Sequence, residues 1–447
     1  MHSPALAPAP AGSAPPADVR AVDARAARRL LLASTAGTVV EWYDFFVFAT
    51  AAALVFDRLF FPRADPLVGV LYALMTYAVG FVTRPIGGIV FGVLGDRYGR
   101  KRALVWSLVL MGGATVGVGL LPTYATAGAL APALLVLLRL VQGLAVGGEV
   151  GGAVLLVAES LPGAQRGRWT AWPQTGGPAG NVLAAAVIAA VGALVGEQAF
   201  AAWGWRVPFL LSAALVGVGA WTRRQVEESP LYAALQRRRA AGAATARTAL
   251  APYWRRVARV LLVKAGENAL FYLFLTFVVV YATRVLHVPR GRALAATLVA
   301  SAVEVPVIVW AGALSDRVGR RPVTAAGLLG AALWAFALFP AMGRGGAAAL
   351  TAAVAAGAAC HGVIVGGMSA FFVEQFPTAV RYAGFSLGYQ LASVLSGAVA
   401  PVVGVALLDR YGSTVPVSCY AAAMALPALL AVWRAPETRG ADLAAVS

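Results

Sequence analysis

The sequence predicts an all-α polytopic membrane protein in which twelve transmembrane helices form two pseudo-symmetric six-helix bundles. Of its 447 residues, 60% are hydrophobic and 12% are charged, whereas soluble chains carry about 25% charged residues. Residues 92–102 read GVLGDRYGRKR and residues 312–322 read GALSDRVGRRP, so one basic loop occurs twice, 220 positions apart. Internal repeats of this kind are typical of membrane proteins built from two related halves.

Apolar runs of spanning length occur twelve times. A hydrocarbon core about 30 Å thick needs about 20 apolar helical residues for each crossing. The expected spans are 31–57, 67–94, 104–122, 129–158, 169–195, 206–222, 260–283, 293–314, 322–341, 346–374, 383–408 and 415–433.

The distribution of Lys and Arg predicts the orientation. Segments on the N-terminal side of the membrane hold 25 of the 36 basic residues, and segments on the other side hold 8. This bias places both termini in the cytoplasm. The net charge of +17 therefore reflects topology; we expect a multi-pass protein of the inner membrane whose partner is the lipid bilayer and not nucleic acid.

The polar segments divide the chain into five regions. The longest polar stretch between spans separates two groups of six spans, and the Ala/Pro-rich start lacks the features of a signal peptide. Cys360 and Cys419 fall inside apolar runs and are expected to be inert. The predicted regions are a disordered cytoplasmic tail (1–30), an N-terminal bundle (31–222), a cytoplasmic linker (223–259), a C-terminal bundle (260–434) and a cytoplasmic tail (435–447).

A second repeat supports the duplication. Residues 159–166 read ESLPGAQR and residues 374–381 read EQFPTAVR, so that Glu, Pro and Arg match at an offset of 215. Both copies follow the fourth span of their half. Two independent motifs at nearly equal offsets favour two related bundles.

The duplicated loop resembles the G-x-L-x-D-R-x-G-R-[RK] signature of the major facilitator superfamily. A narrower set of motifs is similar to the bacterial metabolite:proton symporters, which include permeases for α-ketoglutarate, citrate, shikimate and proline/betaine. The resemblance covers residues 30–440, and it implies a central cavity lined mainly by spans 1, 4, 7 and 10. The motifs are GTVVEWYDF (37–45), RPIGG (84–88), RLVQG (139–143), GGE (147–149) and WGWRVP (203–208).

Ionisable residues avoid the spans that this resemblance turns toward lipid. Spans 3, 9 and 12 contain no charged residue and span 6 has only Arg206 at its outer end, whereas spans 1, 2, 4, 7 and 8 contain charged residues and span 10 contains a histidine. Because each charge at membrane depth costs roughly 2.5–3.5 kcal/mol, such groups are expected to face a watery passage or each other. They are Glu41, Asp44, Arg84, Arg139, Glu149, Lys264, Glu267, Glu304 and His361.

Four of these residues form the predicted proton-coupling set. Glu41 and Asp44 lie three apart on one helix face, and two carboxylates in a poorly solvated cavity cannot both ionise cheaply. The alternative is a structural pair held by an Arg of span 4. Arg139 needs a carboxylate or an anionic ligand. Glu149 lies about 80° around the helix from it, so Arg139 is expected to pair with Asp44 or Glu41. In the wider superfamily the Arg of R-x-x-Q-G is linked to proton transfer, and a static buried ion pair is the alternative.

Substrate binding is assigned first to Arg84. It precedes Pro85, whose position in a span predicts a kink and local polar lining. Arg84 could hold a substrate carboxylate bidentately, or it could brace span 2 against span 11. In the second half Lys264 and Glu267 are expected to neutralise each other, and Glu304 and His361 are read as isolated, with His361 as a packing residue or a titrating group. The other predicted substrate residues are Tyr43, Gln174, Asn268, Tyr272, Tyr389 and Gln390.

The duplicated loops and the second repeat are interpreted as gating machinery. Asp96 is expected to face the N-terminus of a helix from the other half, and Arg100 and Arg166 are expected to join Glu159. Such a cluster holds one conformation shut and breaks in another. The predicted gating residues are Asp96, Arg97, Arg100, Glu159, Arg166, Asp316, Arg317, Arg320, Glu374 and Arg381.

These features predict a secondary active transporter and not an enzyme. We expect proton-coupled uptake of a small polar metabolite, a carboxylate or a zwitterion, by a monomer that uses no metal and no cofactor apart from the proton as coupling ion. The alternatives are a drug or metabolite exporter working by proton antiport, and a substrate sensor that no longer transports. Residues 173–181 (PQTGGPAGN) partly match the G-P-x-x-G-G element of antiporters, but Asn181 replaces the second Gly.

Overall fold

The computed structural model describes residues 24–62, 66–240, 250–397 and 399–446, and within them all regular secondary structure is helical. The first half contains α1 (Ala24–Ala51), α2 (Asp57–Phe60), α3 (Pro66–Val82), α4 (Arg84–Tyr98), α5 (Arg100–Leu120), α6 (Tyr124–Ala127), α7 (Leu130–Ser160), α8 (Arg166–Gln174), α9 (Gly176–Val195), α10 (Glu197–Ala199) and α11 (Arg206–Arg224). After α12 (Pro230–Ala240), the second half contains α13 (Trp254–Tyr272), α14 (Val278–Arg284), α15 (Arg290–Val318), α16 (Arg320–Met342), α17 (Gly346–Val373), α18 (Arg381–Ala392), α19 (Val399–Tyr411) and α20 (Val415–Trp433).

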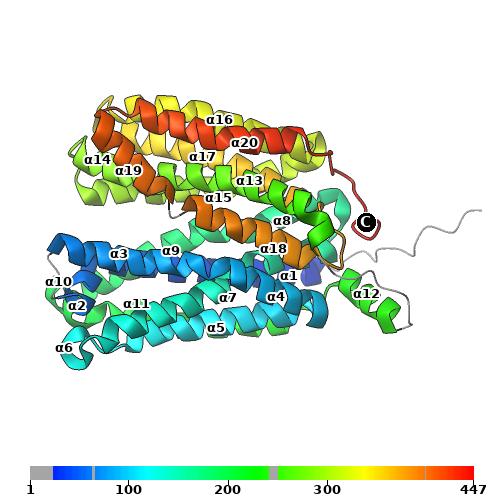
Figure 1. Ribbon diagram of the computed structural model, residues 1–447, viewed down its shortest axis with the longest axis horizontal. Coiled ribbons are helices and arrows are strands. Elements are labelled where there is room, and N and C mark those ends of the chain that lie inside the picture. Colours follow the sequence, from blue (N-terminus) through cyan, green and yellow to red (C-terminus); the bar gives the residue numbers. More distant parts are fainter. Residues whose placement is uncertain (1–23, 63–65, 241–249, 398, 447) are drawn as a thin grey trace, which may run out of the picture.

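The spans largely follow the sequence prediction. Among the described residues, ten helical segments are long and apolar enough to cross a membrane, and the pair Glu197–Gly204 and Arg206–Arg224, bent by 59°, makes an eleventh. The expected second span consists of α3 and α4, which are too short individually and which lie end to end in Figure 1. The break falls at Thr83, directly before Arg84 and Pro85, where the proline cannot continue the hydrogen-bond ladder.

Four π-helical turns occur among the described residues. They are Ala52–Phe56 after α1, Leu273–Phe277 after α13, Ser393–Gly397 after α18, and Phe200–Gly204 before α11. Widened turns of this kind mark functional sites in many helical proteins because they interrupt regular side-chain packing. The first two occupy equivalent places in the two halves, which agrees with the duplication.

The helices form two groups, and Figure 1 shows α1–α11 in one and α13–α20 in the other. The groups touch most closely at the end that carries the duplicated loops, here called the inner end. There the backbones approach so closely that a Cβ atom on Gly312 of α15 would lie 2.5 Å from the carbonyl oxygen of Gly167 in α8. Only glycine permits this contact, so the two groups are closed against each other at the inner end.

Two predicted boundaries move. Helix α1 begins at Ala24, so the expected tail 1–30 is partly helical, and residues 1–23 lie outside the described residues. Helix α11 continues through Arg223, which is buried and was wrongly assigned to the linker. A run of two arginines after an apolar stretch signals a span end, but it does not show that the first of them turns back into the bundle.

Candidate functional site

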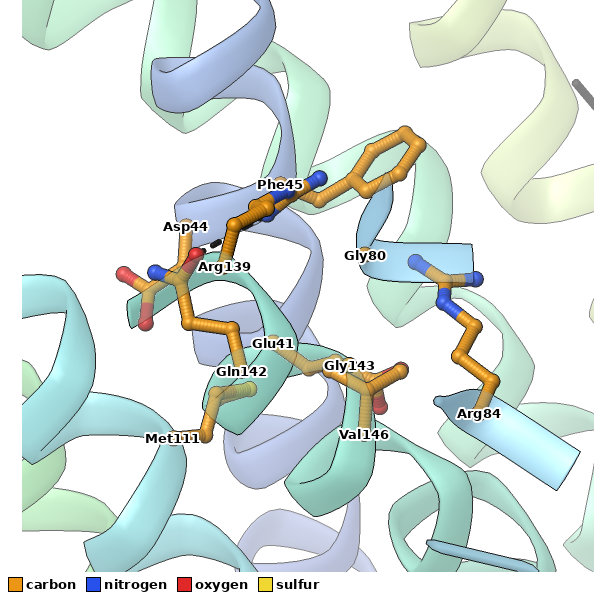
Figure 2. A pocket seen from close by; sticks show the side chains of 10 residues that line it. All are labelled: Glu41, Asp44, Phe45, Gly80, Arg84, Met111, Arg139, Gln142, Gly143 and Val146. Carbon is orange, nitrogen blue, oxygen red and sulfur yellow. Dashed lines mark hydrogen bonds between the residues drawn. The ribbon is translucent and has the colours of Figure 1, made fainter. Parts of the chain in front are cut away.

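The first cavity lies inside the N-terminal bundle. Helices α1 and α7 supply seven of its ten lining residues, and α3, α4 and α5 supply one each (Figure 2). It collects both predicted coupling acids of α1 and both embedded arginines of this half. Its lining residues are Glu41, Asp44, Phe45, Gly80, Arg84, Met111, Arg139, Gln142, Gly143 and Val146.

Asp44 is held by two hydroxyl groups. Thr115 of α5 donates to Oδ2 at 2.8 Å and Ser212 of α11 donates to Oδ1 at 2.6 Å. The side chain is buried, so these bonds replace the water that a carboxylate would otherwise bind. Asp44 can therefore be ionised or protonated in place, because hydroxyl groups can both donate and accept.

Arg139 is connected to Asp44 through two neutral side chains. Its Nη1 donates to Oε1 of Gln142 at 3.0 Å, and Nε2 of Gln142 donates to the Thr115 hydroxyl at 2.7 Å. The guanidinium also lies over the ring of Phe48, 4.3 Å from its centroid. The sequence left the partner of Arg139 open between two carboxylates and did not reveal this chain of hydrogen bonds, although Gln142 stands three residues after Arg139 on the same helix face.

Glu41 and Arg84 face the same cavity with unsatisfied polar atoms. Oε2 of Glu41 and Nε of Arg84 are buried and have no hydrogen-bond partner among the described residues. The Arg84 guanidinium instead lies over the ring of Phe81, 4.2 Å from its centroid. In Figure 2 the Glu41 side chain points toward the Arg84 side of the cavity, whereas Asp44 points away from it. A bound water would satisfy both groups, because it can accept from Arg84 and donate to Glu41.

Glu149 lies outside this cavity. Both of its oxygens accept from the Arg223 guanidinium, and Ser107 donates to Oε2 at 3.0 Å. Glu149 is therefore paired with Arg223 and does not line the cavity that holds the other three predicted coupling residues. Arg223 is the missed partner, because the sequence placed it in the linker.

The second cavity lies between the two bundles. The N-terminal half contributes Trp42, Gln174, Gly177 and Pro178. The C-terminal half contributes Lys264, Glu267, Asn268, Phe271, Glu304, Ile308, His361, Val365, Met368 and Tyr389. Glu41 and Trp42 are adjacent in α1, and they face different cavities, so α1 forms the wall between the two.

The charged residues of the second cavity form one cluster. Lys264 pairs with Glu267 at 2.5 Å, as expected, and lies over the Tyr389 ring at 4.3 Å. The expectation that Glu304 and His361 are isolated is wrong, because His361 bridges Glu267 and Glu304. The three residues come from α13, α15 and α17, and a single sequence does not show which faces of separate helices meet.

The other predicted substrate residues divide into two groups. Gln174, Asn268 and Tyr389 line the second cavity. Tyr43, Tyr272 and Gln390 line neither cavity: the Tyr43 hydroxyl donates to the carbonyl of Pro208, Tyr272 packs on Phe271, and Gln390 donates across the bundles to backbone carbonyls of α7. Polarity in a span predicted burial of these residues, but it did not predict their orientation.

At the inner end, the aspartates of the two duplicated loops cap helices of the opposite bundle. Oδ2 of Asp96 accepts from the backbone N–H of Ala383 at 3.1 Å, in the first turn of α18. Asp316 accepts from the backbone N–H groups of Gly167 and Arg168 at 2.8 and 2.9 Å, in the first turn of α8. A carboxylate at a helix N-terminus is stabilised by the helix dipole, so each loop holds the other bundle.

The second repeat adds two ion pairs that cross between the bundles. Glu159 pairs with Arg381 at 2.9 Å, and Glu374 pairs with Arg166 at 2.8 Å. Arg100 and Arg320 complete the two clusters, and they contact the acids of their own halves.

Two expectations for the inner end change. The prediction that Arg166 joins Glu159 is wrong. Arg166 and Arg381 each follow a turn that contains a proline, and each pairs with the acid of the other bundle. Arg97 and Arg317 are exposed and stand outside the two clusters.

Two glutamates missed by the sequence analysis cap the third spans. Glu228 accepts from the backbone N–H of Arg100 at 3.1 Å, and Glu437 accepts from that of Arg320 at 2.9 Å. The following hydroxyl residues, Ser229 and Thr438, donate to Glu159 and Glu374 at 2.5 and 2.6 Å. Partial burial favours a higher pKa of Glu437, but four backbone N–H groups outweigh it, so that the pKa lies below its usual value. The sequence already contained a signal for these caps, because the pairs Glu228-Ser229 and Glu437-Thr438 lie 209 positions apart.

Two related helical bundles that are clamped at one end and enclose charged cavities at membrane depth define a solute carrier. The comparisons with known proteins give the family. The profile of the Major Facilitator Superfamily matches residues 35–401, and the chain belongs to this superfamily of transporters, which are not enzymes.

Relatives of this chain carry metabolites across membranes. It is 39% identical over 425 residues to the inner membrane metabolite transport protein YhjE of Escherichia coli (strain K12), covering 93% of this chain and 95% of that protein. It is 37% identical to the shikimate transporter of the same organism, covering 86% and 89%. The structure also matches the proton:xylose symporter XylE with a TM-score of 0.78 and 17% identity, covering 95% and 99% of the two chains. The chain is therefore a multi-pass metabolite transporter.

Proposed function

We propose that the protein is a proton symporter that takes up a small polar metabolite bearing a carboxylate, an anion or a zwitterion, by alternating access. It acts as a monomer in the inner membrane, with both termini in the cytoplasm and with residues 31–222 and 260–434 as its moving bundles. The shikimate transporter similar to it supports a carrier of a small polar metabolite; the proton coupling and the choice of substrate class rest on the cavities.

The observation that carries the proposal is the pairing of unsatisfied charges in the first cavity. Arg84 is only 9% exposed and its Nε has no partner among the described residues, while Oε2 of Glu41 is also unpartnered. Buried polar atoms without partners are costly, so the cavity favours a ligand that supplies an acceptor to Arg84 and a donor to Glu41. A substrate carboxylate and a proton supply both.

The inner-end contacts support alternating access. Two crossing ion pairs and two crossing helix caps close the inner end, and all of them join groups on different bundles. Because these contacts are discrete, the bundles can rock between a closed and an open arrangement. In this scheme Glu41, Asp44 and Arg139 serve proton coupling, and the gating residues open and close the inner end.

Reconstituted vesicles test the proposal. With an acidic exterior, labelled shikimate, α-ketoglutarate, citrate, proline and glycine betaine are offered in turn, and an uncoupler is expected to abolish accumulation of the true substrate. The variant Arg84→Lys keeps the charge but loses the bidentate geometry. Loss of one charge-assisted hydrogen bond of about 1.5–3 kcal/mol is expected to raise the KM about 12- to 140-fold.

Arg206→Met is the matched control for that variant. Arg206 is a second arginine of the N-terminal half, but its guanidinium donates to the carbonyls of Gly119 and Leu121 away from both cavities. Its KM is expected to stay unchanged. Equal KM values for the wild type and Arg84→Lys would remove Arg84 from substrate binding. Accumulation driven by an acidic interior would favour antiport, and ligand binding without flux would favour a sensor.

A further inference from the structure

A histidine in the C-terminal bundle lies between two carboxylates. Nδ1 of His361 is 2.5 Å from Oε1 of Glu304, and its Nε2 is 2.9 Å from Oε1 of Glu267. All three side chains are at least 95% buried, with exposed fractions of 4%, 1% and 2% for His361, Glu304 and Glu267. These three residues are here called the acid–imidazole triad.

Both contacts have hydrogen-bond length, and together they require two hydrogens. A neutral imidazole carries one N–H, and an ionised carboxylate is only an acceptor. With a neutral histidine and two ionised glutamates, one ring nitrogen would present a lone pair to a carboxylate oxygen. The observed geometry therefore needs one additional proton on the triad, either on the ring or on a carboxyl group. This count does not depend on which atom carries the hydrogen.

The charge of the surroundings leads to the same result. Lys264 pairs with the second oxygen of Glu267 at 2.5 Å. The ionisable residues lining this cavity are Lys264, Glu267, Glu304, His361 and Tyr389. With the additional proton, the cluster of Lys264 and the triad is neutral, and without it the cluster carries one buried negative charge. An unbalanced buried charge is strongly destabilising.

The triad is open to the second cavity. Oε2 of Glu304 is buried without a hydrogen-bond partner among the described residues, and Glu304 lines the cavity together with Trp42 and Gln174 of the other bundle. A water or ligand at this oxygen can exchange a proton with the triad. The site therefore meets the passage between the bundles instead of being sealed in a helical core.

We propose that the acid–imidazole triad is a second proton site of this transporter, separate from Glu41 and Asp44, and that its proton is linked to the substrate in the second cavity. An anionic or zwitterionic substrate near Lys264 is stabilised by the neutral, protonated cluster, so that proton and substrate load together. A cationic ligand would instead compete with the proton. The linkage to transport rests on the proposed symport, but the presence of the proton does not.

Aromatic contacts join the triad to α1, the wall between the two cavities. The Phe271 ring lies 5.1 Å from the His361 ring and 5.9 Å from the Trp42 ring. Trp42 follows Glu41 in α1, so a shift of α1 during rocking changes the surroundings of both proton sites.

Nitrogen NMR of the imidazole ring tests the proposal without any substrate. The chain has three histidines, and the variant with both His2→Asn and His287→Asn leaves His361 as the only one. This protein, labelled with 15N-histidine and held in lipid nanodiscs, is measured at neutral pH together with the infrared band of protonated carboxyl groups. Glu304→Gln is then introduced into the same background, and Asp44→Asn serves as the matched control.

The expected spectrum shows hydrogen on both ring nitrogens, or one ring N–H together with a protonated-carboxyl band that Glu304→Gln removes. Since glutamine is uncharged, Glu304→Gln should also release the additional proton, and Asp44→Asn should leave the His361 signals unchanged. A neutral ring without such a carboxyl band overturns the proposal. If Glu304→Gln does not fold, the parent spectrum alone decides. If the triad proton is found but uptake proves independent of the proton gradient, the proposed function fails while the proton site stands.

Discussion

Breaking one crossing ion pair should shift the equilibrium between the closed and the open inner end. In Arg381→Met the buried Glu159 loses its partner from the other bundle but keeps Arg100 at 3.4 Å and the Ser229 hydroxyl at 2.5 Å. The loss is therefore that of one charge-assisted hydrogen bond, about 1.5–3 kcal/mol, and not that of a fully orphaned charge. At about 1.4 kcal/mol per tenfold change, the closed state should be disfavoured roughly 12- to 140-fold.

Spin labels at Tyr98 and Val318 measure this shift. These residues occupy equivalent places in the two duplicated loops, one on each bundle, and are 50% and 52% exposed. With Cys360 and Cys419 replaced by serine, the distance distribution between the labels should be dominated by a short distance in the parent and should gain a longer one in Arg381→Met. Arg168→Met, an exposed arginine at the same end, is the control and should match the parent. If Arg381→Met also matches the parent, the crossing pairs do not hold the inner end closed.

Four further predictions follow from the contacts. Asp44→Asn should abolish proton-driven accumulation but leave counterflow exchange, and unchanged accumulation would remove Asp44 from coupling. Arg223→Met should destabilise the protein by about 3–5 kcal/mol, because Glu149 is left buried without its partner; Arg223→Met with Glu149→Met should recover most of this in thermal melting, and no recovery would refute the ion-pair explanation. Deleting residues 440–447 removes the carbonyls of Ala441 and Leu443 that accept from Arg166 and Arg381, so the longer label distance should become more populated, and an unchanged distribution would contradict this. The pKa of Glu437 is lowered in the folded state, so the stabilising effect of its ionised carboxylate is present above the unfolded pKa of about 4.3 and is lost as the pH falls through the folded pKa. Glu437→Gln should therefore lower the melting temperature at pH 7 and have less effect in acid. An equal effect at both pH values would contradict this prediction.

The architecture was accessible from the sequence because its signals are local or repeated. Apolar length predicts spans, and the loops at 92–102 and 312–322 predict duplication. The position of Arg84 and Pro85 correctly predicted a break in the second span, because the effect of proline on a helix is local. Even the contact of Asp96 with a helix of the other bundle could be predicted from the general preference of carboxylates for helix N-termini.

The site was only partly accessible, because its contacts join separate helices. The sequence showed that Glu267, His361 and Glu304 are buried, but not that α13, α15 and α17 bring them together. It also assigned Arg223 to the linker by composition, and so it missed the partner of Glu149. Tyr43 was read as cavity lining from its place in span 1, but its hydroxyl turns into the bundle and donates to Pro208. A rotation of about 100°, one residue along a helix, decides between these outcomes, and hydropathy does not record it.

The most direct test of proton symport records solute and protons in the same vesicles. Purified protein is reconstituted with a pH indicator inside, and labelled substrate is added outside without an imposed gradient. The account predicts that substrate entry acidifies the interior, and that Asp44→Asn abolishes the acidification while exchange of substrate continues. Substrate entry with no acidification, or with alkalinisation, would contradict it.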